Sequence, residues 1–250
     1  PLFEKFKQQD ISNDTLYQQV CELKIELVLT AHPTEVSRRT LIQKYDGIND
    51  CLSKCDQQKL TPRERQAVLA DLKQLITSAW QTDEIRQHRP TPIDEAKWGF
   101  TTIEQTLWNA VPKFIRELDS MVQDQCGQNL PLHVAPVRFA SWMGGDRDGN
   151  PNVTHKVTQE VLWLSRWKAA DLYLRDIEDL RWELSIQQCS DELQQALGQP
   201  HPEPYREYLR DTRERLKATR SWLAEKLSGK DADDSQVIKT KDELLEPLLA

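Results

Sequence analysis

Two short segments of this chain concentrate the side chains that could do chemistry. The first spans residues 30–35 (Thr-Ala-His-Pro-Thr-Glu) and places His32 beside a stiffening proline, with Glu35 close enough to orient or charge it. Imidazole titrates near neutrality, so His32 can accept and return a proton at working pH. A lone histidine is also often a structural residue. The surroundings of His32 favour a general base, but its residue type alone does not decide between the two roles.

The second segment spans residues 144–151 (Gly-Gly-Asp-Arg-Asp-Gly-Asn-Pro) and holds three of the eight glycines of the chain. Glycines let backbone N–H groups approach an anion, and Arg147 can add several donors to a phosphate or carboxylate. A nucleotide P-loop is excluded because Asn150 and Pro151 stand where Lys and Ser or Thr should be, and Pro151 also replaces the turn glycine of a calcium loop. A tight turn in which Arg147 pairs with its flanking aspartates remains an alternative.

Two adjacent arginines follow the first segment. Arg38 and Arg39 come shortly after His32 and would point off the start of the same helix. Adjacent arginines usually form a solvated helix face, although they could equally receive a phosphorylated ligand at a protein interface. Both interpretations stay open from the residues alone.

Each polar segment directly follows a predicted strand. Residues 25–30 alternate and are aliphatic or β-branched, and residues 134–142 are similar, although Pro136 weakens the start of the second strand. Active sites of parallel α/β folds gather at the carboxyl ends of strands, so two polar loops in this position form a suggestive pair. The two strands either pair with each other or have their partners outside this chain.

Most of the remaining sequence shows helical periodicity. Thr61 and Thr91 each begin a helix with a capping box and a proline at the first helical position. The second of these helices is expected to kink at Pro112. Further helices are predicted after Thr154 and over residues 204–227.

The end of the last long helix and the tryptophans complete the structural predictions. Gly229 is expected to end that helix, and residues 230–237 are polar enough to form a mobile loop. The eight tryptophans recur at helical spacings and are interpreted as core packing rather than as a ligand cage; they include Trp80, Trp98, Trp108, Trp142, Trp163 and Trp167.

Composition limits the class of protein. The 250 residues suffice for one large domain or two small ones. Hydrophobic residues make up 38% and charged residues 29%, as in a soluble, helix-rich protein. The net charge of -7 argues against a general nucleic-acid binder. No apolar run reaches the roughly 18–20 residues of a membrane helix, and the N-terminus does not resemble a signal peptide.

The cysteines and the last residues carry two further expectations. The five cysteines are interpreted as reduced thiols, which implies a reducing compartment, most simply the cytoplasm. Cys51 and Cys55 are close in sequence, but no second Cys or His pair stands near them to complete a zinc site. The apolar stripe of residues 244–250 is still unburied where the sequence stops, so we expect the chain to be part of a longer protein.

Four blocks of sequence resemble the phosphoenolpyruvate carboxylase family, in order and in spacing, and resemble its bacterial forms most closely: residues 30–35, 80–86, 94–99 and 141–151. The resemblance implies a reaction in which bicarbonate and phosphoenolpyruvate give oxaloacetate and phosphate, which replenishes the tricarboxylic acid cycle. A non-catalytic helical module that reuses this region as a scaffold or regulatory partner is one alternative. An unrelated phosphate-binding enzyme is the other.

The resemblance also implies roles for individual residues. The first catalytic histidine of the family corresponds to His32, which would handle the proton that bicarbonate or carboxyphosphate must give up. The loop of residues 144–151 lies beside the same pocket in the family. The implied site residues are catalytic His32, substrate-binding Gly145, Asp146 and Arg147 and, as in some plant members, activator-binding Arg38, Arg39 and Arg86.

The fold implied by the resemblance is mainly α, part of a helix-rich (β/α)8 TIM-like barrel with only the first one or two barrel strands present. Residues 1–250 would form a single N-terminal region of a cytoplasmic homotetramer that responds to allosteric effectors. The family uses Mg²⁺ or Mn²⁺, with metal ligands and other essential groups further along the chain. We therefore expect this segment alone to show no carboxylase turnover. Neither nucleic acid nor a membrane is an expected partner.

Overall fold

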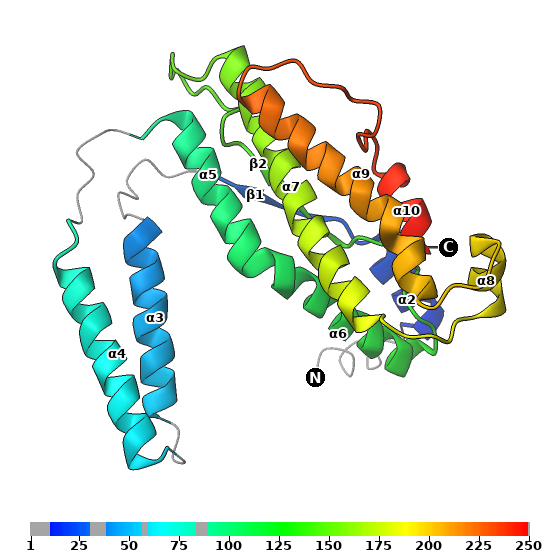
Figure 1. The fold of residues 1–250 in the computed structure, drawn as a ribbon, viewed down its shortest axis with the longest axis horizontal. Coiled ribbons are helices and arrows are strands. Elements are labelled where there is room, and N and C mark those ends of the chain that lie inside the picture. The colour runs from blue at the N-terminus through cyan, green and yellow to red at the C-terminus, as the bar shows by residue number, and fades with distance from the viewer. Residues whose placement is uncertain (1–10, 31–38, 57–59, 84–89, 250) are drawn as a thin grey trace.

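The computed structural model describes residues 11–30, 39–56, 60–83 and 90–249, and of Arg39 it describes the backbone only. The described residues are mainly helical, which confirms the predicted class (Figure 1). The helices are α2 (Asn13–Glu22), α3 (Arg39–Cys55), α4 (Pro62–Trp80), α5 (Pro92–Thr102), the π-helical turn η1 (Ile103–Leu107), α6 (Trp108–Cys126), α7 (His155–Glu183), α8 (Asp191–Leu197), α9 (Pro204–Leu227) and α10 (Asp242–Leu249).

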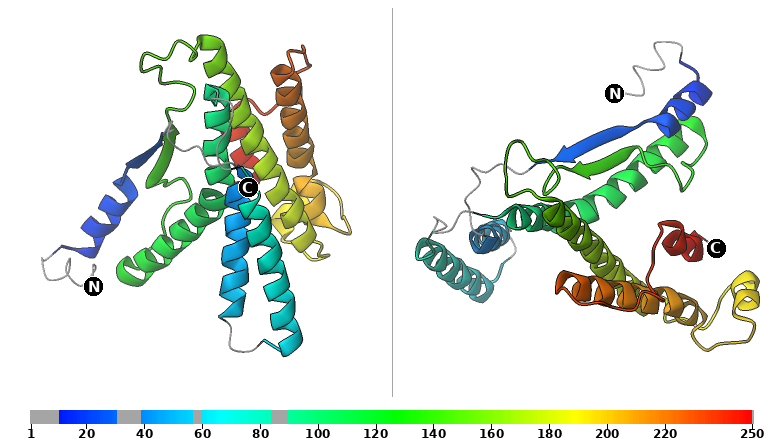
Figure 2. Two further views of the ribbon diagram at one scale, coloured as in Figure 1. Left: turned by 90° about the vertical axis from the view of Figure 1, so that its left-hand side faces the viewer. Right: turned by 90° about the horizontal axis from the view of Figure 1, so that it is seen from above.

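The two predicted strands pair with each other. β1 (Ile25–Leu29) and β2 (Val137–Ser141) run parallel, with Ile25 opposite Val137 and Leu29 opposite Ser141. The second strand begins later than predicted because Pro136 has no N–H group to donate to the ladder. Its carbonyl still accepts a hydrogen bond of 2.8 Å from the Ile25 N–H. The two arrows lie side by side in the views of Figure 2.

The predicted helix starts at Thr61 and Thr91 are confirmed. The Thr61 N–H donates to the Glu64 carboxylate at 2.8 Å, and the Glu64 N–H donates back to the Thr61 hydroxyl at 3.3 Å. Thr91 and Asp94 form the same reciprocal pair, at 3.0 and 3.2 Å. Each pair satisfies two N–H groups that a helix start leaves without partners, and so fixes where α4 and α5 begin.

The irregular turn of the long α5–α6 segment lies N-terminal to the predicted kink. Pro112 is inside α6, whereas the π-helical turn η1 precedes α6 and the Trp108 N–H bonds back to the Ile103 carbonyl. Figure 2 shows α5 and α6 running in different directions on either side of this turn. Proline disturbs the turn before it, and π-turns are a common cause of helix bends. The carboxylate of Glu104 in η1 holds the turn on α7 through Lys168 at 2.9 Å and Arg175 at 3.2 Å.

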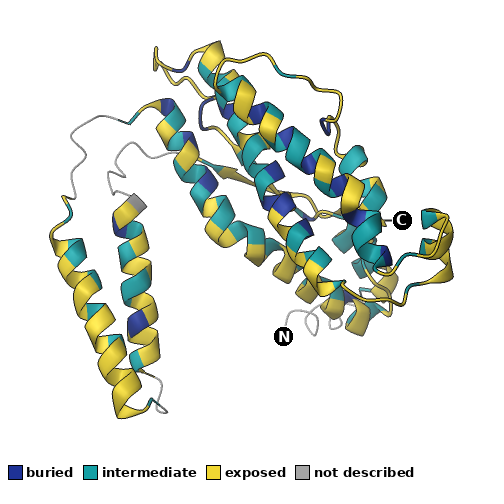
Figure 3. Cartoon of the chain, in the orientation of Figure 1, coloured by how far each residue is buried: buried dark blue, intermediate teal, exposed yellow. Residues whose placement is uncertain are grey.

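The core is aliphatic rather than built on tryptophan. One cluster joins α7 to α9, and a second joins α5, α7 and the loop after β2; their buried members are Leu174, Ile177, Leu209, Leu216 and Ile238 in the first and Ala96, Phe100, Met143 and Val161 in the second. The prediction that the tryptophans form the core is wrong for Trp80, Trp142 and Trp182, which are 90%, 56% and 74% exposed. Trp80 lies in the last turn of α4, a helix that is exposed along most of its length (Figure 3), and Trp142 lies just beyond the end of β2.

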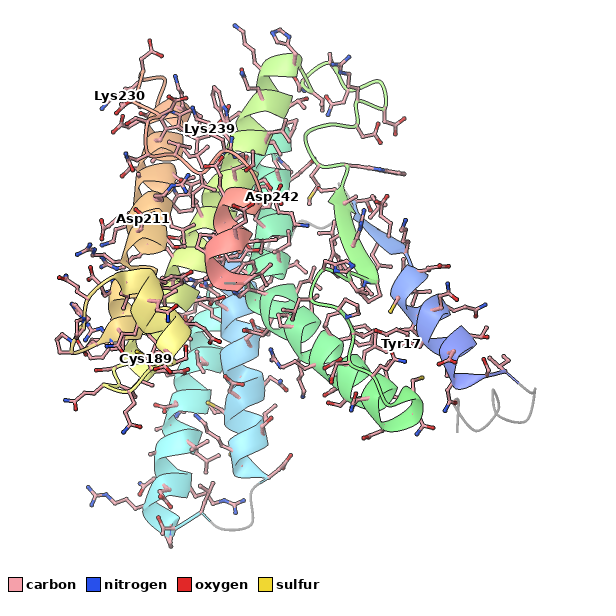
Figure 4. The ribbon with its side chains drawn as sticks, turned by 90° about the vertical axis from the view of Figure 1, so that its right-hand side faces the viewer. Tyr17, Cys189, Asp211, Lys230, Lys239 and Asp242 are labelled. Carbon is pink, nitrogen blue, oxygen red and sulfur yellow. The ribbon has the colours of Figure 1, made fainter. Side chains whose placement is uncertain are left out.

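The segment after α9 contains no helix or strand over residues 228–241. Figure 4 labels Lys230 and Lys239 near its two ends, beside α9. Ile238 anchors this segment, because its N–H donates to the Thr219 hydroxyl at 2.9 Å and its carbonyl accepts from Arg166 at 3.0 Å. Val237 and Ile238 are buried. The mobility of residues 230–237 stays a prediction. The C-terminal end of this segment is packed against α7 and α9.

Candidate functional site

The parallel pairing brings the carboxyl ends of the two strands together. Leu29 lies opposite Ser141, and the Trp142 N–H donates to the Leu29 carbonyl at 3.0 Å. Thr30, which opens the first polar segment, therefore lies beside the start of the second. His32 follows two residues later and lies outside the described residues. The pairing of the two predicted strands is confirmed, whereas the meeting of His32 with the loop after β2 stays a prediction.

A pocket of about 660 Å³ lies at these strand ends. Thr30 lines it from the end of β1, Glu95 and the residues around Thr91 line it from the start of α5, and Trp142 and Arg147 line it from the loop after β2. Parallel-stranded folds commonly bind ligands at this edge. The pocket therefore combines a position suited to ligand binding with charged groups of both signs.

Gly144 fixes the start of the loop of residues 144–151, which we call the glycine loop. Its φ of 71° is left-handed, and a Cβ at this position would lie 2.5 Å from the Val161 side chain. Only glycine meets both demands without strain. Gly145 differs, because a Cβ there would lie 3.7 Å from the Trp142 carbonyl oxygen, which is an ordinary contact. The two neighbouring glycines thus have different structural importance.

The backbone of the glycine loop uses some of the N–H groups that an anion could have bound. The Gly145 and Asp146 N–H groups both donate to the Trp142 carbonyl, at 3.0 and 2.9 Å. The Asn150 N–H donates to the Arg147 carbonyl at 2.5 Å. The expectation that glycines present free N–H groups to an anion is therefore wrong for Gly145 and Asp146. An anion at this loop would depend on the Arg147 side chain instead.

Arg147 is exposed at the edge of the pocket. Within the described part of the chain, no carboxylate forms an ion pair with it, and this includes its neighbours Asp146 and Asp148. The alternative in which Arg147 pairs with its flanking aspartates is therefore not found. The five N–H donors of this guanidinium remain available to a ligand.

The remaining predicted site residues have no described side chain. His32, Arg38 and Arg86 lie outside the described residues, and Arg39 is the first residue of α3 without a described side chain. Their grouping with the glycine loop stays a prediction.

The sequence reasoning missed Thr158, whose hydroxyl donates to the Gly144 carbonyl at 2.7 Å. Thr158 lies in the first turns of α7, one turn after the N-cap Thr154. The only signal in the sequence is its helical spacing from that cap, which does not reveal a contact with a distant loop.

The described residues show neither a metal-binding cluster nor a membrane-spanning helix. Among them, no group of three or more His, Cys, Asp or Glu side chains is arranged to hold a metal ion. The described residues therefore do not fit the Mg²⁺ or Mn²⁺ that the family resemblance implies. None of the described helices is long and apolar enough to cross a membrane. None of the five cysteines forms a disulfide bond.

The fold and the pocket define a helix-rich protein with a candidate ligand site at the ends of a parallel strand pair, and comparison with known proteins identifies its family. The family model described as phosphoenolpyruvate carboxylase matches residues 1–250. The chain belongs to the phosphoenolpyruvate carboxylase family.

Three relatives illustrate this similarity. The phosphoenolpyruvate carboxylase of Acinetobacter baumannii is 81% identical over 248 residues, and that of Acinetobacter baylyi is 79% identical over 248 residues. The phosphoenolpyruvate carboxylase of Marinobacter nauticus is 55% identical over 247 residues. Each alignment covers 99% of this chain but 28% of the relative, so the chain spans little more than a quarter of the length of these curated relatives.

Proposed function

We propose that the whole protein carboxylates phosphoenolpyruvate with bicarbonate, giving oxaloacetate and phosphate, and that the strand-end pocket is part of its active site. The observation that carries the second half of this proposal is the guanidinium of Arg147 at the edge of the pocket, which forms no ion pair with any carboxylate that the structure describes. A phosphorylated three-carbon acid carries phosphate and carboxylate oxygens, which are the groups that arginine binds best. The product oxaloacetate would replenish the tricarboxylic acid cycle.

The proposed chemistry divides between the two polar segments. Bicarbonate attacks the phosphoryl group, which gives carboxyphosphate and the enolate of pyruvate. Carboxyphosphate then releases CO₂ and phosphate, and the enolate carbon forms a bond to CO₂. His32 would take and return the proton that bicarbonate or carboxyphosphate gives up. The Arg147 side chain would hold the anionic substrate near this base.

Other parts of the proposed enzyme lie beyond this chain. The Mg²⁺ or Mn²⁺ ion would be held by residues of the remaining protein. β1 and β2 would be the first strands of a helix-rich (β/α)8 barrel that the rest of the chain completes, within a cytoplasmic homotetramer. Allosteric effectors would act on the whole protein, with Arg38, Arg39 and Arg86 as candidate activator-binding residues. The 250-residue segment alone would show no turnover.

The test of this function is His32→Asn in the full-length protein. We expect the variant to lose oxaloacetate formation, measured with a coupled malate dehydrogenase assay, and to keep the melting temperature of the wild type. His133→Asn is the matched control, because His133 is exposed and does not line the pocket. Near-normal carboxylation by His32→Asn would remove this histidine from the mechanism, and an inactive wild type would remove the proposed function itself.

A further inference from the structure

The glycine loop is held at its start by two helices. On one side, the hydroxyl of Thr158 in α7 donates to the Gly144 carbonyl at 2.7 Å, and Val161 fills the space that a Gly144 Cβ would need. On the other side, the Met143 side chain occupies the place of a Gly99 Cβ in α5, which would lie 1.9 Å from the Met143 Cε. The loop therefore leaves the core at a fixed point.

The path from this point to Arg147 is short and internally bonded. Arg147 comes three residues after Gly144, and the Gly145 and Asp146 N–H groups between them both bond to the Trp142 carbonyl. Only two residues separate Gly144 from Arg147. A shift of the Gly144 carbonyl would therefore also shift the Arg147 backbone. Gly144 itself is buried, whereas Arg147 is exposed.

We infer that Thr158 is a positioning residue, which orients the glycine loop so that the Arg147 guanidinium faces the pocket. Thr158 is not among the residues that line the pocket, so it would act through the loop and not by contact with a ligand. The effect on substrate use rests on the proposed function, because the contact with substrate is assigned to Arg147. The orientation of the loop does not rest on it.

Among the described residues, the Gly144 carbonyl is the one long-range partner of the Thr158 hydroxyl. The hydroxyl also lies 3.2 Å from the Thr154 carbonyl, which is a contact within its own helix. A valine at this position would keep the shape and the branched Cβ of threonine and would remove only the donor. A serine would keep the donor and remove the methyl group. These two variants separate the hydrogen bond from the packing.

The experiment compares Thr158→Val, Thr158→Ser and Thr77→Val in the full-length protein. Thr77 is the matched control, because its hydroxyl donates to the Lys73 carbonyl of its own helix at 2.7 Å and Thr77 does not line the pocket. For Thr158→Val we expect faster amide hydrogen exchange in the peptide covering residues 143–150. We also expect a fall in kcat/KM for phosphoenolpyruvate of about 10-fold, since small misplacements of a positioning group are costly.

Three controls separate the loss of the hydrogen bond from a general loss of stability. The melting temperature of Thr158→Val should stay within about 3 °C of the wild type, Thr158→Ser should recover most of the lost kcat/KM, and Thr77→Val should match the wild type. Unchanged exchange in Thr158→Val would overturn the inference. A loosened loop with unchanged kcat/KM would also overturn it, because positioning would then have no consequence.

The proposed function fails by a different result. A wild-type protein that forms no oxaloacetate under any condition would contradict the carboxylase proposal. The exchange measurement would then decide alone whether Thr158 fixes the glycine loop, because this readout needs no substrate.

Discussion

Arginines in two regions of the molecule have opposite surroundings. Between α7 and α9, Arg213 donates to Glu178 at 2.7 Å and Arg220 donates to Asp171 at 2.9 Å. These pairs lie around the aliphatic cluster that joins the two helices. At the strand ends, Arg147 has no ion pair among the described residues although two aspartates flank it. The same residue type thus serves packing in one region and is left available in the other.

This difference separates a structural role from a binding role. A paired and partly buried arginine has its charge neutralised, and the pair fixes how two helices meet. An exposed arginine that lacks a partner costs little, because water solvates it, and it retains its donors for an anion. The comparison therefore predicts that substitutions of the paired arginines will lower stability, whereas substitution of Arg147 will lower substrate use.

The largest expected effect is at the anchor of the glycine loop. Gly144→Ala would force an L-residue to a φ of 71° and drive its Cβ to 2.5 Å from Val161, so we expect a loss of about 3 kcal/mol of local stability. Hydrogen exchange of the α7 amides in the full-length protein would measure this loss. Gly145→Ala is the control, because its Cβ has room. A small effect of Gly144→Ala would mean that the anchor is not rigid.

A smaller effect is expected in the paired region at acid pH. Hydrogen bonds from Ser185 and from Arg206 hold the pKa of the Glu203 carboxyl below its ordinary value of 4.5. Because this pKa is lowered by folding, the stabilisation is present above about pH 4.5 and is lost as pH falls through the folded pKa. Glu203→Gln should therefore melt at a lower temperature than the wild type at pH 7.

The pH dependence of the Glu203→Gln variant tests whether the charge of Glu203 causes this stabilisation. The difference in melting temperature between Glu203→Gln and the wild type should shrink as pH falls through the lowered pKa of Glu203 in the folded protein, since the wild-type carboxyl is then increasingly protonated. A difference that stays constant with pH would show that the Glu203 charge does not contribute.

Local features of the fold could be predicted from the sequence. Thr61 and Thr91 each combine a capping side chain, a following proline and an acidic third residue, and these signals act within one helical turn. The two strands were predicted from local alternation in the same way. The short helices α2 and α8 gave no comparable periodicity, because few turns define a pattern.

Features that depend on distant contacts could not be predicted. The sequence left open whether the strands pair with each other, and that pairing decides whether the two polar segments meet. The exposure of Trp80 depends on how little of α4 its neighbours cover, which no local pattern records. The same is true of the bond between Thr158 and Gly144. For the candidate site, the sequence therefore indicated Arg147 but not the bond that Thr158 forms with the start of the glycine loop.

The most direct test of the account compares Arg147→Ala with Arg213→Ala in the full-length protein. We expect Arg147→Ala to lower kcat/KM for phosphoenolpyruvate by about 100-fold, the scale of a lost charge-stabilising donor, with the melting temperature unchanged. Arg213→Ala should instead cost about 1 kcal/mol of stability, because it breaks a partly buried pair, and leave kcat/KM within about 2-fold. Normal substrate use by Arg147→Ala, or equal losses in both variants, would contradict the account.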